Sequence, residues 1–80
     1  MDDRAIIDRI NELANEEHAL FRKESREQAS EEDRRRMQEL QTTLDQCWDL
    51  LHQRRARRSA GMDPDDATVR DAATVEGYVD

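Results

Sequence analysis

Two pairings of a histidine with a carboxylate are the first candidates for chemistry in this 80-residue chain. Glu17 and His18 are adjacent, and His52 follows Asp49 by three residues. Carboxylate and imidazole side chains together suggest a metal ion or a proton-transfer site. A di-metal helical bundle, however, uses Glu-x-x-His, and position 15 is Asn15. We therefore predict a surface histidine on each helix and no cofactor, with a metal-binding bundle through Glu17 and His18 as an alternative.

A dense basic run provides the second candidate. It contains the four arginines Arg54, Arg55, Arg57 and Arg58, which could contact the phosphates of a nucleic acid. Arginines are also expected in the last turns of a helix because they stabilise its negative end, and no aromatic residue lies among them to stack on bases. The formal net charge is −7, with six acidic side chains and one basic side chain in residues 63–80. Such a chain is a poor partner for nucleic acid, so this function remains an alternative.

Two polar side chains fall at positions where helices are expected to meet. The carboxylate of Glu17 faces Leu40, which is costly unless it reaches an arginine or water, or fixes the register. A carboxylate directed at a ligand or metal is the functional alternative. Cys47 is the only cysteine and has no neighbouring histidine or lysine, so we expect it to behave as a small apolar residue. Without a glycine-rich phosphate loop or a nucleophile motif, the chain is not expected to be an enzyme.

The elements that position these side chains are predicted to be helices. Charged residues make up 41% of the chain, aromatic residues 4%, and there are two glycines and one proline, a composition typical of all-α proteins. Apolar residues at three–four spacing predict helices over residues 3–24 and 31–59. Leu13 and Leu40 occupy equivalent heptad positions, yet their separation is one residue short of four heptads. The phase therefore slips near residues 24–33, which predicts a turn rather than one continuous coiled coil.

The resulting hairpin has a specific register. Suppose that the chain folds back at Gln28–Ala29. Each residue of the first helix then faces the residue of the second helix for which the two residue numbers add up to 57, and five layers of side chains meet, as antiparallel packing requires. Asp3 then approaches Arg54 at the open end. The predicted core comprises Ile6, Ile10, Leu13, Leu20, Met37, Leu40, Leu44, Cys47 and Leu51. We expect residues 1–62 to form this coiled-coil-like hairpin and residues 63–80 to form an acidic tail, partly ordered or docked.

One side of the hairpin, which we call the apolar flank, carries Ile7, Ala14, Phe21, Gln41 and Trp48. The opposite side carries mostly polar side chains, among them Arg9, Glu16 and Lys23, with Leu50 as an exception. Burial of a large apolar side chain contributes about 1.5–3 kcal/mol, and a lone hairpin cannot cover the apolar flank. We therefore predict a homodimer that forms a four-helix bundle and serves as a protein–protein interaction or scaffolding module.

Several strings of residues resemble a known family. They are Ile6–Leu13, Glu16–Leu20, Leu44-Asp45-Gln46-Cys47-Trp48-Asp49-Leu50-Leu51 running on into Gln53–Ala56, and Val75–Tyr78. Together they resemble a family of small actinobacterial proteins known only as a domain of unknown function. The resemblance implies no activity. Because no apolar run approaches the ~20 residues needed to cross a bilayer and no signal peptide precedes the first helix, we expect a cytoplasmic protein.

Overall fold

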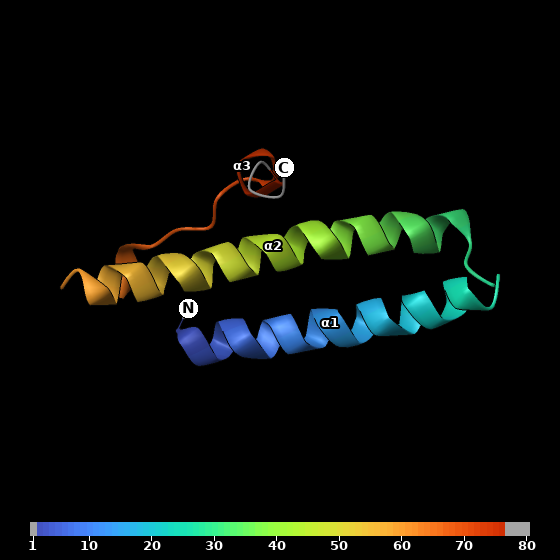
Figure 1. Cartoon of the computed structure of the whole chain (residues 1–80), viewed down its shortest axis with the longest axis horizontal. Helices are drawn as coiled ribbons and strands as arrows, with labels where there is room; N and C mark the ends of the chain where they lie inside the picture. Colours follow the sequence, from blue (N-terminus) through green and yellow to red (C-terminus); the bar gives the residue numbers. More distant parts are fainter. Residues whose placement is uncertain (1, 77–80) are drawn as a thin grey trace.

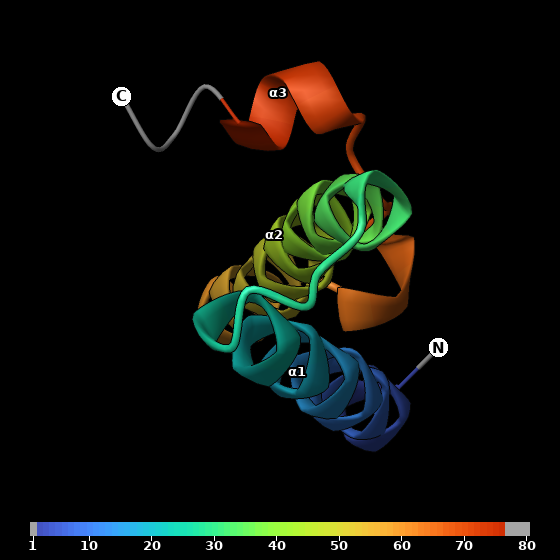
Figure 2. The ribbon, with the colours of Figure 1, turned by 90° about the vertical axis from the view of Figure 1, so that its right-hand side faces the viewer.

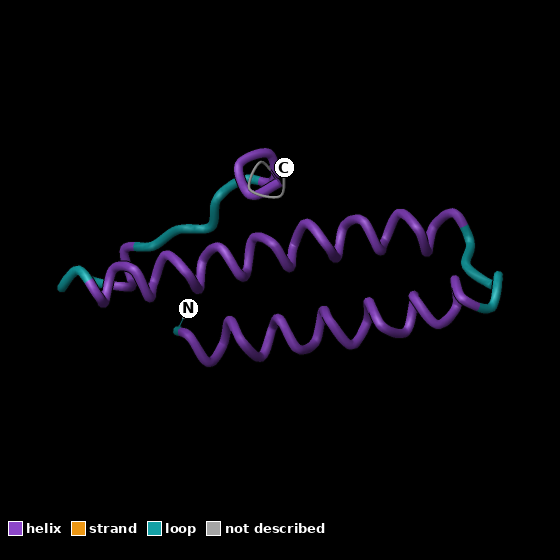
Figure 3. Tube along the Cα trace, in the orientation of Figure 1, coloured by secondary structure: helices purple, strands orange, loops and turns teal. Residues whose placement is uncertain are grey.

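Two long antiparallel helices and a returning tail make up residues 2–76, the part of the chain that the computed structural model describes. Helix α1 (Asp3–Ser25) and helix α2 (Glu31–Ser59) form the hairpin, followed by the 3-10 turn η1 (Pro64–Asp66) and the short helix α3 (Ala72–Glu76) (Figures 1 and 3). Residues 2–76 contain no strand, which confirms the all-helical prediction for this part of the chain. Helix α1 is one residue longer than expected. Tyr78 and the last residues of the predicted tail lie outside the described residues.

Both long helices begin at a residue whose side chain binds the exposed amides of the first turn. The Asp2 carboxylate accepts a hydrogen bond from the Ala5 amide at 2.8 Å. The Ser30 hydroxyl accepts one from the Asp33 amide, and the Asp33 carboxylate accepts one from the Ser30 amide, both at 3.1 Å. This reciprocal pair is a capping box, which provides partners for amides that would otherwise have none. It fixes the first residue of α2 close to the turn.

Both long helices also end with the same backbone hydrogen bonds. The Gln28 amide donates to the Lys23 carbonyl at 2.9 Å, and the Met62 amide donates to the Arg57 carbonyl at 2.8 Å. Each is the closing bond of a Schellman motif, in which the preceding residue adopts a left-handed backbone conformation. Gly61 has this role in α2 with φ of 73°, whereas α1 uses Glu27 with φ of 57°. A side chain at a left-handed position is strained, so the turn between the helices carries a cost that glycine would avoid.

The substitution Glu27→Gly is therefore expected to stabilise the protein. Relief of the left-handed conformation should raise the free energy of unfolding by about 0.5–1 kcal/mol, after allowance for the greater freedom of glycine in the unfolded chain. Urea denaturation followed by circular dichroism measures the change. The matched variant Gly61→Ala places a side chain at the equivalent position of α2, where no atom lies within 4 Å of the added carbon, and should destabilise by a similar amount. Equal stabilities for Glu27→Gly and the wild type would contradict the assignment of strain.

The core lies along the line where α1 and α2 meet. It consists of two clusters of buried side chains, Ile6, Ile10, Leu50 and Leu51 near the open end, and Leu13, Leu20, Met37 and Leu40 near the turn. Leu44 and Cys47 of the predicted core are half-buried and pack against both clusters. Ion pairs tie the two helices together outside the core, between Lys23 and Asp33 at 3.3 Å and between Arg36 and Glu16 at 3.1 Å. Contacts therefore extend along the whole length of α1.

The tail runs back along α2 after a reversal at Gly61. Both η1 and α3 pack against α2, and α3 lies on the side of α2 away from α1 (Figure 2). Val75 is the buried residue of α3, with 2% of its surface exposed. Ala67, in the segment between η1 and α3, packs against the core cluster that contains Leu50. Residues 64–76 thus form a docked element, one of the two arrangements that the sequence left open.

Candidate protein-interaction surface

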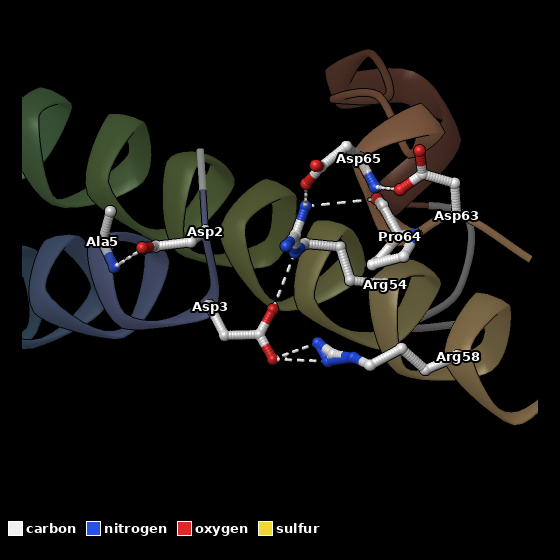
Figure 4. A network of polar contacts seen from close by, with 8 residues as sticks. All are labelled: Asp2, Asp3, Ala5, Arg54, Arg58, Asp63, Pro64 and Asp65. Carbon is white, nitrogen blue, oxygen red and sulfur yellow. Dashed lines mark hydrogen bonds and ion pairs between the residues drawn. The ribbon is translucent and has the colours of Figure 1, made fainter.

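Arg54 joins three separate parts of the chain at the open end of the hairpin (Figure 4). Its Nε donates to Oδ1 of Asp3 at 2.7 Å, and its Nη1 donates to Oδ1 of Asp65 at 3.0 Å and to the Pro64 carbonyl at 3.2 Å. Arg58 donates from both Nη atoms to Oδ2 of Asp3. Only 8% of the Arg54 side chain is exposed, because α1, α2 and η1 converge on it. The planar guanidinium suits this role since it offers several donors in fixed directions.

This network changes the interpretation of the basic run at residues 54–58. Hydrogen bonds from Arg58 and then Arg54 lower the pKa of the Asp3 carboxyl to about 2, and Asp3 and Asp65 raise the pKa of Arg54. Arg54 and Arg58 therefore contact carboxylates of this chain. Of the four arginines, Arg55 and Arg58 are exposed, Arg57 is half-buried and Arg54 is buried. Nucleic-acid binding through this run stays a prediction, with Arg54 and Arg58 already paired to carboxylates.

The Asp3 network predicts an acid-dependent loss of stability. The pKa of Asp3 lies near 3.8 in an ordinary environment and at about 2 in the folded protein. The stabilisation from its charge is therefore complete above about pH 4 and is lost as the pH falls through 2. The wild type should have a higher Tm than Asp3→Asn at neutral pH, and the difference should shrink towards zero as the pH approaches 2. Asp8→Asn, an exposed carboxylate on the same helix, is the control, and a constant difference for Asp3→Asn would contradict the prediction.

The histidines and Cys47 do not come together into a site. His18 and His52 are exposed, and His52 lies beside Trp48 with ring centroids 6.3 Å apart. Across residues 2–76, no three histidine, cysteine, aspartate or glutamate side chains are placed to hold one metal ion. Burial raises the pKa of the Cys47 thiol, which makes it a weaker nucleophile.

Glu17 is the polar residue in the row of otherwise apolar side chains through which α1 faces α2. Its side chain is half-buried next to the core cluster at the turn end. Among the described residues, the Glu17 side chain takes part in no hydrogen bond or ion pair. Its carboxylate therefore does not reach an arginine, and contact with water or a role in register remains.

One face of α2 is covered by the tail, and we call it the tail face. Gln46 Nε2 donates to the Arg70 carbonyl at 3.1 Å, and Gln53 Nε2 donates to the Thr68 carbonyl at 2.8 Å. Asp49 pairs with the Arg70 guanidinium at 3.5 Å. Leu50, the apolar exception on the mostly polar flank, is buried with Ile6, Ile10 and Leu51 in the core cluster at the open end, against which Ala67 of the tail packs.

These tail contacts could not be found from periodicity. Two of them join a glutamine amide to a backbone carbonyl, and a carbonyl is present at every residue. The weak signals in the sequence were the polar spacing of Gln46, Asp49 and Gln53 on one side of a helix, and the isolated apolar residues Ala67 and Val75.

The apolar flank remains open on the side of α2 away from the tail face. Ile7, Phe21 and Trp48 are 40%, 44% and 45% exposed, although each is a large apolar side chain. Ala14 is half-buried and Gln41 is exposed. In helical projection Trp48 and Gln41 lie on one edge of the core seam of α2, whereas Gln46 and Gln53 lie beyond the other edge. The tail therefore covers the side of α2 away from α1, and Ile7, Phe21 and Trp48 of the apolar flank stay exposed.

Comparison with known proteins places the chain in a family. Within the described residues, no helix is long and apolar enough to cross a membrane. The uncharacterized proteins Rv0898c of Mycobacterium tuberculosis and Mb0922c of Mycobacterium bovis are each 44% identical to the chain over 77 residues, which cover 95% of this chain and 88% of the relative. No solved structure matches the chain. The family model described as "Protein of unknown function (DUF2630)" matches residues 2–80, and the chain belongs to this family.

Proposed function

We propose that the protein is a non-enzymatic protein–protein interaction module that acts as a homodimer, in which the apolar flanks of two hairpins meet to form a four-helix bundle. The observation that carries this proposal is the exposure of Ile7, Phe21 and Trp48 on one side of the hairpin, while the tail packs on the side of α2 away from α1. Ile7 and Phe21 are separated by four helical turns with Ala14 midway between them. A small residue at the centre of a flank lets two helices approach closely.

The accessible surface area of the chain is larger than that expected of a compact monomer, which favours association with a partner. The chain exposes 5786 Å², whereas a compact monomer of 9.4 kDa is expected to expose roughly 5,000 Å². The radius of gyration is 14.8 Å, against about 12 Å for a compact domain of this length. The excess surface is close to the ~800 Å² that each partner contributes to a standard interface. An interface of ordinary size would therefore bring the protein to the surface area of a compact one.

The distribution of charge also favours self-association through this flank. The outer border of the flank is formed by residues at seven-residue spacing, Asn11, His18 and Ser25 in α1, and Gln38, Asp45 and His52 in α2. One of these six is acidic. Of the acids in the tail, Asp65 pairs with Arg54 at the open end of the hairpin, whereas Glu76 lines the same hollow as Gln41 and Asp45. Few acids therefore lie along this border although the net charge is −7, which limits the repulsion between two copies.

Sedimentation velocity at micromolar concentration tests the proposal. The wild type should sediment as a dimer, and the double variant Phe21→Ala, Trp48→Ala should sediment as a helical monomer. Met62→Ala and Val69→Ala are matched controls, since both residues are more exposed than Trp48 but lie outside the flank, and these variants should remain dimeric. A wild type that is a monodisperse, stably helical monomer would overturn the proposal.

A further inference from the structure

We propose that the tail face of α2 is a binding site for a peptide segment of a partner protein, and that residues 64–76 of this chain occupy it as an internal pseudo-ligand. The residues of α2 that bind the tail, Gln46, Asp49 and Gln53, lie beyond one edge of the core positions of α2, whereas Trp48 of the apolar flank lies on the other edge. The seated tail defines the conformation and the chemistry of the occupant. That occupant has a 3-10 turn, a short stretch without helix and a helical turn, with an acid, a small apolar residue, a basic residue and a branched apolar residue spaced as Asp65, Ala67, Arg70 and Val75.

The first argument is that α2 binds the backbone of the tail. Gln46, Gln53 and Arg54 donate to the carbonyls of Arg70, Thr68 and Pro64 at 3.1, 2.8 and 3.2 Å. Thr68 and Arg70 lie between η1 and α3 outside any helix, so α2 can bind their carbonyls. Main-chain hydrogen bonds supply affinity for an extended peptide whatever its side chains are. Another segment with the same backbone conformation could therefore make the same three contacts.

The second argument is that a few side chains add selectivity. Asp49, whose side chain is 9% exposed, pairs with Arg70 at 3.5 Å, and Arg54 pairs with Asp65 at 3.0 Å. These two pairs have opposite polarity, so the face distinguishes the direction of the bound segment. Val75 is buried and Ala67 packs against the open-end core cluster, so the site has two apolar positions of different size. Asp49 also accepts a hydrogen bond from Gln53 at 2.9 Å, and a basic residue in the occupant adds a partner of opposite charge.

The third argument is that the tail can leave without unfolding the hairpin. Among the described elements, η1 and α3 pack against α2 and not against α1. The tail joins α2 through Gly61, whose left-handed conformation ends the helix. Segments with few buried apolar contacts open at a lower free energy than the whole protein. An attached tail competes at an effective concentration in the millimolar range, so a partner binds well only when the tail is released.

Fluorescence anisotropy with a labelled synthetic peptide of residues 63–80 tests the site. The peptide is titrated into the wild type and into a full-length chain in which the order of residues 64–76 is scrambled. Scrambling keeps the composition and charge of the tail but destroys its register on α2. We expect the peptide to bind the scrambled-tail chain at least about tenfold more tightly than the wild type, because the internal competitor is lost. The substitutions Gln46→Ala and Gln53→Ala in the scrambled-tail chain should weaken this binding, and a scrambled peptide should not bind.

Two further variants keep the test decisive. If the scrambled-tail chain does not fold, the variant Val75→Ala replaces it, because this substitution removes an apolar anchor of the tail without adding charge. The peptide should then bind Val75→Ala more tightly than the wild type. The proposal would be overturned if the peptide bound the wild type and the scrambled-tail or Val75→Ala chain with equal affinity. It would also be overturned if the peptide did not bind a folded form of either variant. Phe21→Ala, Trp48→Ala should leave peptide binding unchanged, so failure of the dimer and failure of the peptide site are distinguishable.

Discussion

A Leu51→Ala variant will lose a large part of the stability of the fold. Leu51 is fully buried and packs with Ile6, Ile10 and Leu50 in the cluster at the open end. Truncation of such a leucine costs about 2–5 kcal/mol, the sum of lost burial and the cavity left behind. For a domain of this size each kcal/mol lowers the Tm by roughly 4–8 °C. Thermal unfolding followed by circular dichroism at one protein concentration should therefore show a fall of roughly 10 °C or more.

Val69→Ala is the matched control for Leu51→Ala. Val69 is an apolar side chain that is 61% exposed in the docked tail, and its truncation should change the free energy of unfolding by less than about 0.5 kcal/mol. Leu40→Ala probes the other cluster, where the leucine is equally buried, and a loss comparable to that of Leu51→Ala is expected. A Leu51→Ala variant as stable as Val69→Ala would show that the two helices do not pack in this register.

Replacement of Arg54 by alanine is expected to have the second-largest effect. The substitution removes the donor to Asp3, Asp65 and the Pro64 carbonyl in one step, and leaves the carboxylate of Asp3 with Arg58 alone. A near-buried guanidinium with three acceptors cannot be replaced by water without loosening what it joins. We expect the Tm to fall several times more than in Arg55→Ala. Amide exchange in residues 64–76 should also become faster, which mass spectrometry measures.

The variant Arg54→Lys separates charge from geometry. An ammonium group keeps the positive charge but does not present a planar fork, so it cannot face Asp3 and Asp65 in the same way. Its stability should lie between those of the wild type and Arg54→Ala, with partial loss of exchange protection in the tail. If Arg54→Ala left tail exchange unchanged, the tail would be held by its apolar contacts and glutamine bonds alone.

The hairpin was predictable because its signals are local and periodic. The phase slip between Leu13 and Leu40 placed a turn near residues 24–33, and the structure has α1 ending at Ser25 and α2 beginning at Glu31. The register in which facing residue numbers sum to 57 anticipated that Asp3 approaches Arg54, and these residues form an ion pair at 2.7 Å. The caps at Asp2 and Ser30 are likewise local, since their side chains act within one helical turn.

The tail and the arginine network were not predictable in the same way. Residue spacing placed Leu50 on the mostly polar flank and outside the predicted core, whereas it is buried with Ile6, Ile10 and Leu51 in a cluster against which Ala67 of the returning tail packs. The basic run looked like one surface because four arginines are close in sequence. In the structure, Arg54 and Arg58 face Asp3, whereas Arg55 is exposed, a separation that follows from the helical positions and from a carboxylate more than fifty residues away.

The ion pairs between α1 and α2 also suggest an order of folding. The pairs Lys23–Asp33, Glu16–Arg36 and Asp3–Arg54 join residues 10, 20 and 51 positions apart in the chain. Each pair closes a loop that encloses the one before it, so each successive closure adds little entropy cost once the previous pair has formed. The hairpin can therefore close like a zipper from the turn, which favours rapid folding. The hydrogen bond from Arg54 to Asp65 then ties the tail to the outermost of these pairs, at the open end of the hairpin.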